Sequence, residues 1–144
     1  MICEFCYTLY MAAKNVHLNW NPDQQFTLQD NDGYQLVMKK PKGVSASDLL
    51  PMALIGCASH DVVEILNKQK QDLRQLNVTA ESIQDETPPW RFRKIHIHFQ
   101  VVGKDIDPEK VHKAIQLSEE KYCSVYATLK DAVEIVNDFE VVEA

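Results

Sequence analysis

The chain has 144 residues, of which 45% are hydrophobic and 25% are charged, and its formal net charge is −6. This acidic balance argues against a nucleic-acid partner and against binding to an anionic membrane surface. Pro51, His60 and Asp61 interrupt the best apolar run, so we expect no membrane-spanning segment. The four cysteines follow no secretory leader, which indicates free or reactive thiols in a reducing cytoplasm rather than a disulfide scaffold.

The N-terminal part of the chain predicts a small antiparallel meander. Its three β-compatible segments are residues 16–20, 25–29 and 34–38. Turn-forming residues separate them, with Asn21-Pro22-Asp23 first and Asp30-Asn31-Asp32-Gly33 second. We expect a single domain over residues 1–144, in which residues 1–10 form a disordered extension.

A long helix is predicted next, over residues 46–73. Ser45 or Ser47 can cap its start, and Pro51 falls in or just after its first turn, where a missing N–H group does least harm. The first half of this helix is apolar nearly all round, whereas the second half is polar on one side. Such a pattern is typical of a central helix around which the rest of a domain packs.

The rest of the chain predicts two strands, two helices and a closing strand. The strands are expected over residues 77–85, 91–102 and 133–142, and the helices start at Pro108 and at about Cys123. Hydrophobic residues alternate with polar ones in the middle strand, so one of its faces is predicted to be buried. The buried set is Ile95, Ile97, Phe99 and Val101. The element order β-β-β-α-β-β-α-α-β predicts an α+β fold around one dominant helix.

Cys57 and Cys123 stand in opposite settings. Cys57 lies in the apolar half of the long helix, where burial raises the pKa of a thiol. Cys123 follows a charged stretch and opens a predicted helix, where backbone N–H groups and the positive helix end lower the pKa. If the fold brings the two together, such a pair suits dithiol redox chemistry better than a structural crosslink.

Both cysteines lie in segments that resemble the motifs of the OsmC/Ohr family. Residues 45–66, with Ala53-Leu54-Ile55-Gly56-Cys57, resemble the helix that carries the first cysteine of that family. Residues 114–129, with Lys121-Tyr122-Cys123-Ser124-Val125, are similar to its second-cysteine motif. The stretch Ile95-His96-Ile97-His98-Phe99 looks like its central strand, so the resemblance covers nearly the whole chain.

The resemblance implies an intertwined homodimer in which antiparallel sheets wrap around long central helices, with active sites at the subunit interface. The better-known members are thiol peroxidases that reduce organic hydroperoxides and need no cofactor or metal. Carried onto this chain, Cys57 is the peroxidatic thiol that becomes a sulfenic acid, and Cys123 is the resolving thiol that forms a disulfide with it. An external dithiol then reduces that disulfide.

The sequence departs from these peroxidases at the charges that activate the first cysteine. There an arginine from the N-terminal sheet supports the thiolate, and a glutamate before the helix holds the arginine, but this chain has no arginine before Arg74. Asp48 stands near the glutamate position, nine residues before Cys57, and is the third predicted site residue. The candidates for the missing positive charge are Lys39, Lys40 and His60. The chain therefore looks closer to branches of the family whose substrate is less certain.

Two other functions stay open at this point. The same scaffold can hold a small apolar ligand at the dimer interface without peroxidase turnover. Metal binding through His96 and His98, with a cysteine as a further ligand, is the other alternative, although the sequence offers no evident third ligand. The pair Cys3 and Cys6 forms a Cys-x-x-Cys without a second such pair, and we interpret it as part of the N-terminal tail.

Overall fold

The computed structural model describes residues 14–22, 25–39 and 43–144, except for the side chain of Lys39. Within it the chain forms two compact units, Met1–Ala46 and Ser47–Ala144, which are described separately. The predicted disordered extension at residues 1–10, with Cys3 and Cys6, lies outside the described residues, and so does Lys40. The prediction of a single domain over the whole chain stays a prediction.

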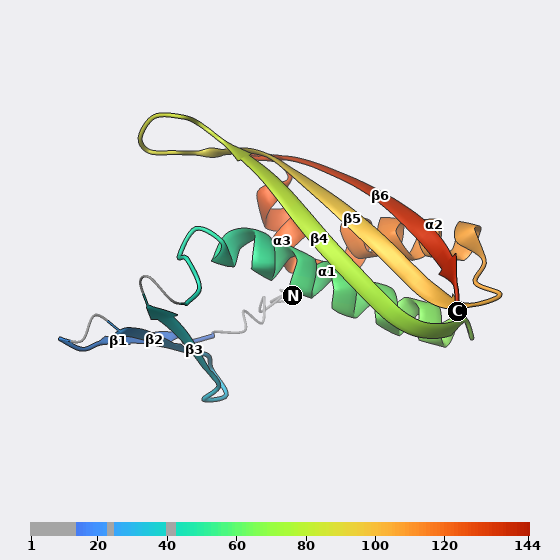
Figure 1. Cartoon of the computed structure of the whole chain (residues 1–144), viewed down its shortest axis with the longest axis horizontal. Coiled ribbons are helices and arrows are strands. Elements are labelled where there is room, and N and C mark those ends of the chain that lie inside the picture. The colour runs from blue at the N-terminus through green and yellow to red at the C-terminus, as the bar shows by residue number, and fades with distance from the viewer. Residues whose placement is uncertain (1–13, 23–24, 40–42) are drawn as a thin grey trace, which may run out of the picture. The chain divides into compact units, whose positions relative to one another are not determined.

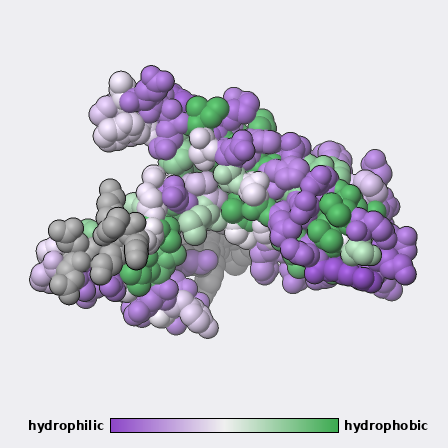
Figure 2. Space-filling view, viewed as in Figure 1, coloured by the Kyte–Doolittle hydropathy of each residue, from purple (hydrophilic) through white to green (hydrophobic). Residues whose placement is uncertain are grey.

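The N-terminal unit contains the predicted antiparallel meander. Its strands are β1 (His17–Trp20), β2 (Gln25–Gln29) and β3 (Gln35–Lys39), in the order β1-β2-β3. Trp20 pairs with Phe26 across the first two strands, with ring centroids 6.5 Å apart, yet both side chains stay exposed. Figure 2 shows hydrophobic residues gathered on the surface over β3. A three-stranded sheet with apolar side chains left in contact with water gains little stability by itself.

The second unit consists of one long helix, a three-stranded sheet and a short helical layer. Its elements in chain order are α1 (Leu49–Lys68), β4 (Asp72–Gln84), β5 (Phe92–Lys104), α2 (Pro108–Leu117), the π-helix η1 (Ser118–Tyr122), α3 (Ser124–Leu129) and β6 (Glu134–Glu143). The sheet has the order β4-β5-β6, with β4 antiparallel and β6 parallel to β5 (Figure 1). The predicted α+β class with a dominant central helix is confirmed.

The core of this unit lies between the inner face of the sheet and the helices. The alternation predicted for β5 is confirmed, because its inward residues Ile95, Ile97, Phe99 and Val101 are all at most 2% exposed. α1 contributes one side chain per turn to the same core, and these are Leu54, Ala58, Val62 and Leu66. The spacing of four residues keeps this stripe on one side of the helix.

The bounds predicted for α1 are wrong at both ends. The helix begins at Leu49 with Asp48 as its N-cap, so neither Ser45 nor Ser47 is the cap residue. It ends at Lys68 rather than Leu73, because Lys70 adopts a left-handed conformation with φ 55°. The N–H of Gln71 then bonds to the carbonyl of Leu66 at 3.0 Å, a pattern that closes helices and usually has glycine in place of the lysine. As a result β4 starts earlier than predicted.

The helix α1 is only partly covered by its own unit. By length and composition alone α1 could cross a membrane, with a mean hydropathy of 1.5, although the sequence predicts no such segment. A core helix of a soluble protein passes the same test, and α1 has four core residues. Ile55 and Ile65 also pack against that core while half-buried, whereas Met52, Ala53 and Gly56 are exposed on the outer side.

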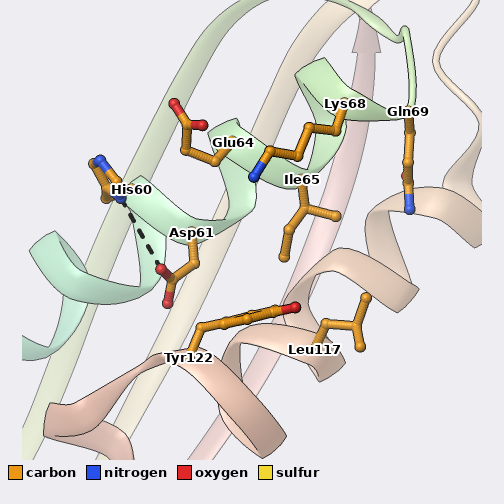
Figure 3. A pocket seen from close by; sticks show the side chains of 8 residues that line it. All are labelled: His60, Asp61, Glu64, Ile65, Lys68, Gln69, Leu117 and Tyr122. Carbon is orange, nitrogen blue, oxygen red and sulfur yellow. Dashed lines mark ion pairs between the residues drawn. The ribbon is translucent and has the colours of Figure 1, made fainter.

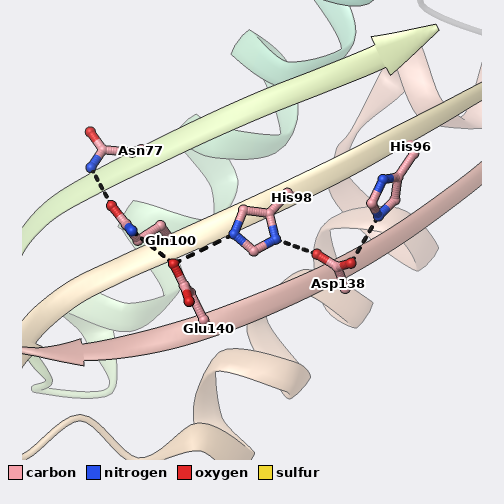
Figure 4. Close-up of polar contacts among 6 residues, drawn as sticks. All are labelled: Asn77, His96, His98, Gln100, Asp138 and Glu140. Carbon is pink, nitrogen blue, oxygen red and sulfur yellow. Dashed lines mark hydrogen bonds and ion pairs between the residues drawn. The ribbon is translucent and has the colours of Figure 1, made fainter.

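The outer face of the sheet carries a row of polar side chains across all three strands (Figure 4). The carboxylate of Asp138 on β6 bonds to both histidines of β5, with His96 Nε2 at 2.9 Å and His98 Nδ1 on its other oxygen. Gln100 donates to Glu140 at 2.7 Å and accepts from Asn77 at 2.8 Å. Asp138 therefore holds one ring nitrogen of each histidine, and the metal hypothesis for this pair depends on the other ring nitrogen of each.

Gly103 lies where β5 meets the start of β4 and the turn that leads to α2. A Cβ at this position would overlap the carbonyl oxygen of Asp72 and would lie 2.8 Å from two side-chain carbons of Ile106. The close approach of the Asp72 backbone thus requires a residue without a side chain.

We predict that Gly103→Ala lowers the free energy of unfolding by about 1–3 kcal/mol or more, because overpacking here displaces backbone rather than a flexible side chain. Urea unfolding followed by circular dichroism measures the change. Lys104→Ala, at the exposed next position, is the control and should stay within about 0.5 kcal/mol of wild type. Equal stability of Gly103→Ala and wild type would contradict the close packing.

We also predict that Asp138→Asn lowers the pKa of His98, which the hydrogen bond to Asp138 and the charge of Glu140 hold above its ordinary value. Because folding raises the pKa of His98, the ion pair of His98 with Asp138 stabilises the fold fully at a pH below the ordinary histidine pKa. This stabilisation is lost as the pH rises through the raised pKa of His98. NMR titration of the imidazole protons measures this. Glu134→Gln, which removes the partner of Lys94 on the same strands, should leave the His98 titration unchanged.

Candidate functional site

Cys57, Asp61 and Cys123 meet at one point between α1 and the segment that follows α2. The two Sγ atoms and a carboxylate oxygen of Asp61 all lie within 4.8 Å of one another. Cys57 and Asp61 are half-buried, whereas Cys123 is only 2% exposed. Both cysteines are free thiols. The structure therefore brings the two predicted cysteines together and adds a carboxylate to them.

The helix α1 and the π-helix η1 determine where the three side chains of this cluster lie. Cys57 and Asp61 are one helical turn apart on α1, so their side chains lie on the same side of the helix. The π-helix η1 brings its first residue, Ser118, under α1, where Ser118 Oγ donates to Asp61 Oδ2 at 2.9 Å. Ser118 is 1% exposed. The N–H of Cys123 bonds to the carbonyl of Ser118 at 2.8 Å, which ties the second cysteine to the same residue.

Cys123 is the N-cap of α3, as the sequence predicts, but the predicted direction of its pKa shift is wrong. Its Sγ accepts a hydrogen bond from the Tyr126 N–H at 3.4 Å, which favours the thiolate. Burial outweighs this bond, and together with the smaller effects of the neighbouring Cys57 and Asp61 it raises the pKa of Cys123 to about 11. A helix of six residues has a weak positive end, so desolvation decides the outcome.

The space beside Cys123 inside the core is very small. A cavity of ≈ 10 Å³ lies among core residues and is bordered by Glu119 and Tyr126. Burial raises the pKa of the Glu119 carboxyl and of the Tyr126 hydroxyl. Such a volume holds about one water molecule and no organic ligand.

A larger groove of ≈ 450 Å³ opens on the other side of Asp61, between α1 and η1 (Figure 3). Asp61 and Tyr122 lie at one end of it, and the ring of Tyr122 lies flat beneath Asp61 and Ile65 in this view. The remaining lining residues are His60, Glu64, Lys68, Gln69 and Leu117. The groove gives solvent molecules and small solutes a path towards the carboxylate of the cluster.

The other predicted site residues lie elsewhere or are not described. Asp48 is exposed at the N-cap of α1 and makes no capping bond through its side chain. It precedes Cys57 by nine residues, which is about 13 Å along the helix axis at about 1.5 Å per residue. His60 is largely exposed, with its Nδ1 4.0 Å from Asp61 Oδ1. The side chains of Lys39 and Lys40 are not described, so the roles predicted for these four residues stay predictions.

Sequence reasoning missed Asp61 and Ser118 as site residues. In the sequence Asp61 stands out only as a charge that interrupts the apolar run, although its position four residues after Cys57 indicates that the two share a helix side. Ser118 precedes Cys123 by five residues, and only the π-helix between them places its hydroxyl next to Asp61. Nothing in the sequence indicated that irregular turn.

Comparison with known proteins agrees with the cysteine motifs. A family model described as OsmC-like protein matches residues 39–137. Protein YhfA of Escherichia coli (strain K12) is 37% identical over 130 residues, which cover 88% of this chain and 97% of that protein. A hypothetical protein from Aquifex aeolicus VF5 has a solved structure with a TM-score of 0.84 at 26% identity, covering 93% of this chain and 99% of that one.

A more distant solved structure is the organic hydroperoxide resistance protein OhrB of Bacillus subtilis, with a TM-score of 0.59 at 15% identity over 90% of this chain and 98% of that chain. At that identity the likeness shows the fold alone. The family match and the identity to YhfA together show that the chain belongs to the OsmC/Ohr family of OsmC-like proteins, which includes hydroperoxide resistance proteins.

Proposed function

We propose that this chain is a cysteine-based thiol peroxidase that reduces organic hydroperoxides. The observation that carries the proposal is the separation of the two sulfurs, which is no more than 4.8 Å. A disulfide needs them at about 2.05 Å, so a side-chain rotation and a small backbone shift have to close a gap of less than about 3 Å. The name of OhrB, a protein of the same fold, supports the choice of organic hydroperoxides.

The reaction runs in three steps on these two sulfurs. The Cys57 thiolate attacks the distal oxygen of a hydroperoxide ROOH, the O–O bond breaks, and the alkoxide takes a proton to leave as ROH. The Cys123 thiol then attacks the sulfenic sulfur of Cys57, which forms the disulfide and releases water. An external dithiol reduces the disulfide by exchange and is itself oxidised. Cys57 is assigned the first role because it is more exposed than Cys123.

A positive charge has to assist the first step. Asp61 lies beside both thiols, and its negative charge opposes the formation of a thiolate. Since no arginine precedes Arg74 in the sequence, we propose Lys39 or Lys40 of the N-terminal unit as the source of that charge. His60 is the candidate from α1 itself.

Free thiols of this kind persist in the cytoplasm, where we propose that the protein acts.

We further propose that two copies form a homodimer through the outer side of α1. That side carries Met52, which is 43% exposed, together with the exposed residues Ala53 and Gly56. A helix side of this apolar character is unfavourable in water and suits contact with the same side of a second copy. Among the described residues, no atom beyond the local helix backbone and the adjacent residues lies within 4 Å of a Cβ built on Gly56, so this position leaves room for a close approach.

The alternative of an apolar-ligand carrier gains no support from the two cavities beside the cysteine cluster. The cavity beside Cys123 is too small for such a ligand, and the groove near Asp61 is bordered by several charged side chains. It remains a prediction about the dimer interface.

We predict that Cys57→Ser abolishes dithiol-dependent consumption of tert-butyl hydroperoxide, because the attacking sulfur is lost. Cys123→Ser and Cys123→Ala should each consume about one equivalent of peroxide and then stop, since no partner resolves the sulfenic acid. Peroxide assays and mass spectrometry of the trapped sulfenic acid measure both effects. All variants carry Cys3→Ser and Cys6→Ser to remove the other thiols, and circular dichroism confirms folding. Slow peroxide loss at one common rate in wild type and variants would remove the proposal.

We predict that Gly56→Lys converts the dimer into a monomer, because two lysines would face each other at the contact between the helices. Sedimentation equilibrium measures the mass of each form. Gln116→Lys, at a helix position of α2 that is also exposed, is the matched control and should stay dimeric. A monomeric wild type, or a Gly56→Lys variant that stays dimeric, would refute the interface.

A further inference from the structure

We propose that the reduced cysteine cluster is also a binding site for a thiophilic divalent cation of the Zn²⁺ class. Its ligands are Cys57 Sγ, Cys123 Sγ and one carboxylate oxygen of Asp61, the three atoms that lie within 4.8 Å of one another. This inference is independent of the peroxidase proposal, because it rests on the placement of the three ligand atoms and on no redox step.

The distances require only a small contraction. Zn–S bonds of about 2.3 Å in a tetrahedral site place two sulfurs about 3.8 Å apart. The observed upper limit of 4.8 Å is about 1 Å longer. Rotation of the Cys57 and Asp61 side chains, which project from the same side of α1 one turn apart, is sufficient to close it. A fourth position stays open for water or another ligand.

The ligand types decide which cation fits. Two thiolates and one carboxylate suit Zn²⁺ and similar borderline or soft cations, whereas Mg²⁺ and Ca²⁺ prefer oxygen ligands throughout. Two thiolates and a carboxylate at this separation carry three negative charges in a half-buried place. A divalent cation relieves the repulsion among them, and binding releases the two thiol protons.

The surroundings supply the second shell that metal sites need. Ser118 Oγ donates to Asp61 Oδ2 at 2.9 Å, and this bond restricts the rotation of the carboxylate beside the two sulfurs. The Tyr126 N–H holds Cys123 Sγ at 3.4 Å. Ser118 and Cys123 are both almost fully buried, so water competes little for the cation on that side.

Metal binding and disulfide formation exclude each other at this site. The cation occupies both thiolates, and a disulfide leaves neither sulfur able to bind it. The same two cysteines therefore give the chain a metal-bound reduced form and a metal-free oxidised form.

Titration of the reduced full-length chain with Zn²⁺ against a chromogenic chelator tests the proposal. The protein carries Cys3→Ser and Cys6→Ser, so that the N-terminal pair cannot bind the cation. We expect about one Zn²⁺ per chain. Oxidation with diamide, which takes two electrons and two protons from the thiol pair, should remove both free thiols and this binding together.

Variants locate the site. Ser118→Ala keeps all three ligands and should weaken binding about 10- to 100-fold, as the loss of an orienting hydrogen bond does elsewhere. Asp61→Asn, of nearly the same shape, should weaken it at least about 10-fold. His96→Ala with His98→Ala is the control and should leave the affinity unchanged. With Co²⁺ as a probe, Cys57→Ser and Cys123→Ser should each reduce the thiolate charge-transfer absorption by about half.

Three results would overturn the proposal. One is a reduced chain that binds no Zn²⁺ in competition with the chelator. Another is an affinity that Asp61→Asn and Ser118→Ala leave unchanged while both variants remain folded. The third is loss of binding in the histidine control, which would move the site to the outer face of the sheet.

Discussion

The hydrogen bond from Ser118 to Asp61 is the contact on which the geometry of the site depends. It joins α1 to η1 through a fully buried hydroxyl and a half-buried carboxylate, and hydrogen bonds to a carboxylate are among the stronger ones in proteins. Because the Cys123 N–H bonds to the Ser118 carbonyl, the position of Ser118 also sets the position of the second cysteine. The distance between the two sulfurs therefore follows from one polar contact and from the packing of α1 under the sheet.

The fold was predictable from the sequence wherever apolar periodicity decides it. The alternation from Ile95 to Val101 predicts the buried face of β5, and Pro108 predicts the start of α2. The structure adds the cap of that helix, where the Asp107 side chain accepts from the Glu109 N–H at 2.9 Å. The end of α1 was not predictable in this way. Lys70 adopts a left-handed conformation that sequence patterns assign to glycine, so the helix was extended too far and β4 was predicted too short.

The candidate site was predictable only in its two sulfurs. The resemblance of their flanking segments identified Cys57 and Cys123, and the structure brings them together. Asp61 was missed because an acid on a helix is usually a solvated group, and only the tertiary fold half-buries it beside thiols. The pKa of Cys123 was misjudged for a related reason. The sequence shows that a helix starts there, but it does not show that the helix has six residues and that the sulfur is buried.

Asp61 also bears on how this chain differs from the peroxidases that its family includes. A thiolate next to a carboxylate and a second thiol is unfavourable unless a cation lies close to it, and repulsion of this kind is strong where water is excluded. In the proposed peroxidase reaction a nearby lysine or histidine would have to meet that requirement, whereas in the proposed metal-bound form the divalent cation itself meets it. The two forms place different demands on Asp61. The carboxylate is a direct ligand of the metal, whereas in the peroxidase reaction its charge works against the attacking thiolate. The presence of an aspartate held by Ser118 at this point is therefore explained more directly by cation binding than by peroxide reduction alone.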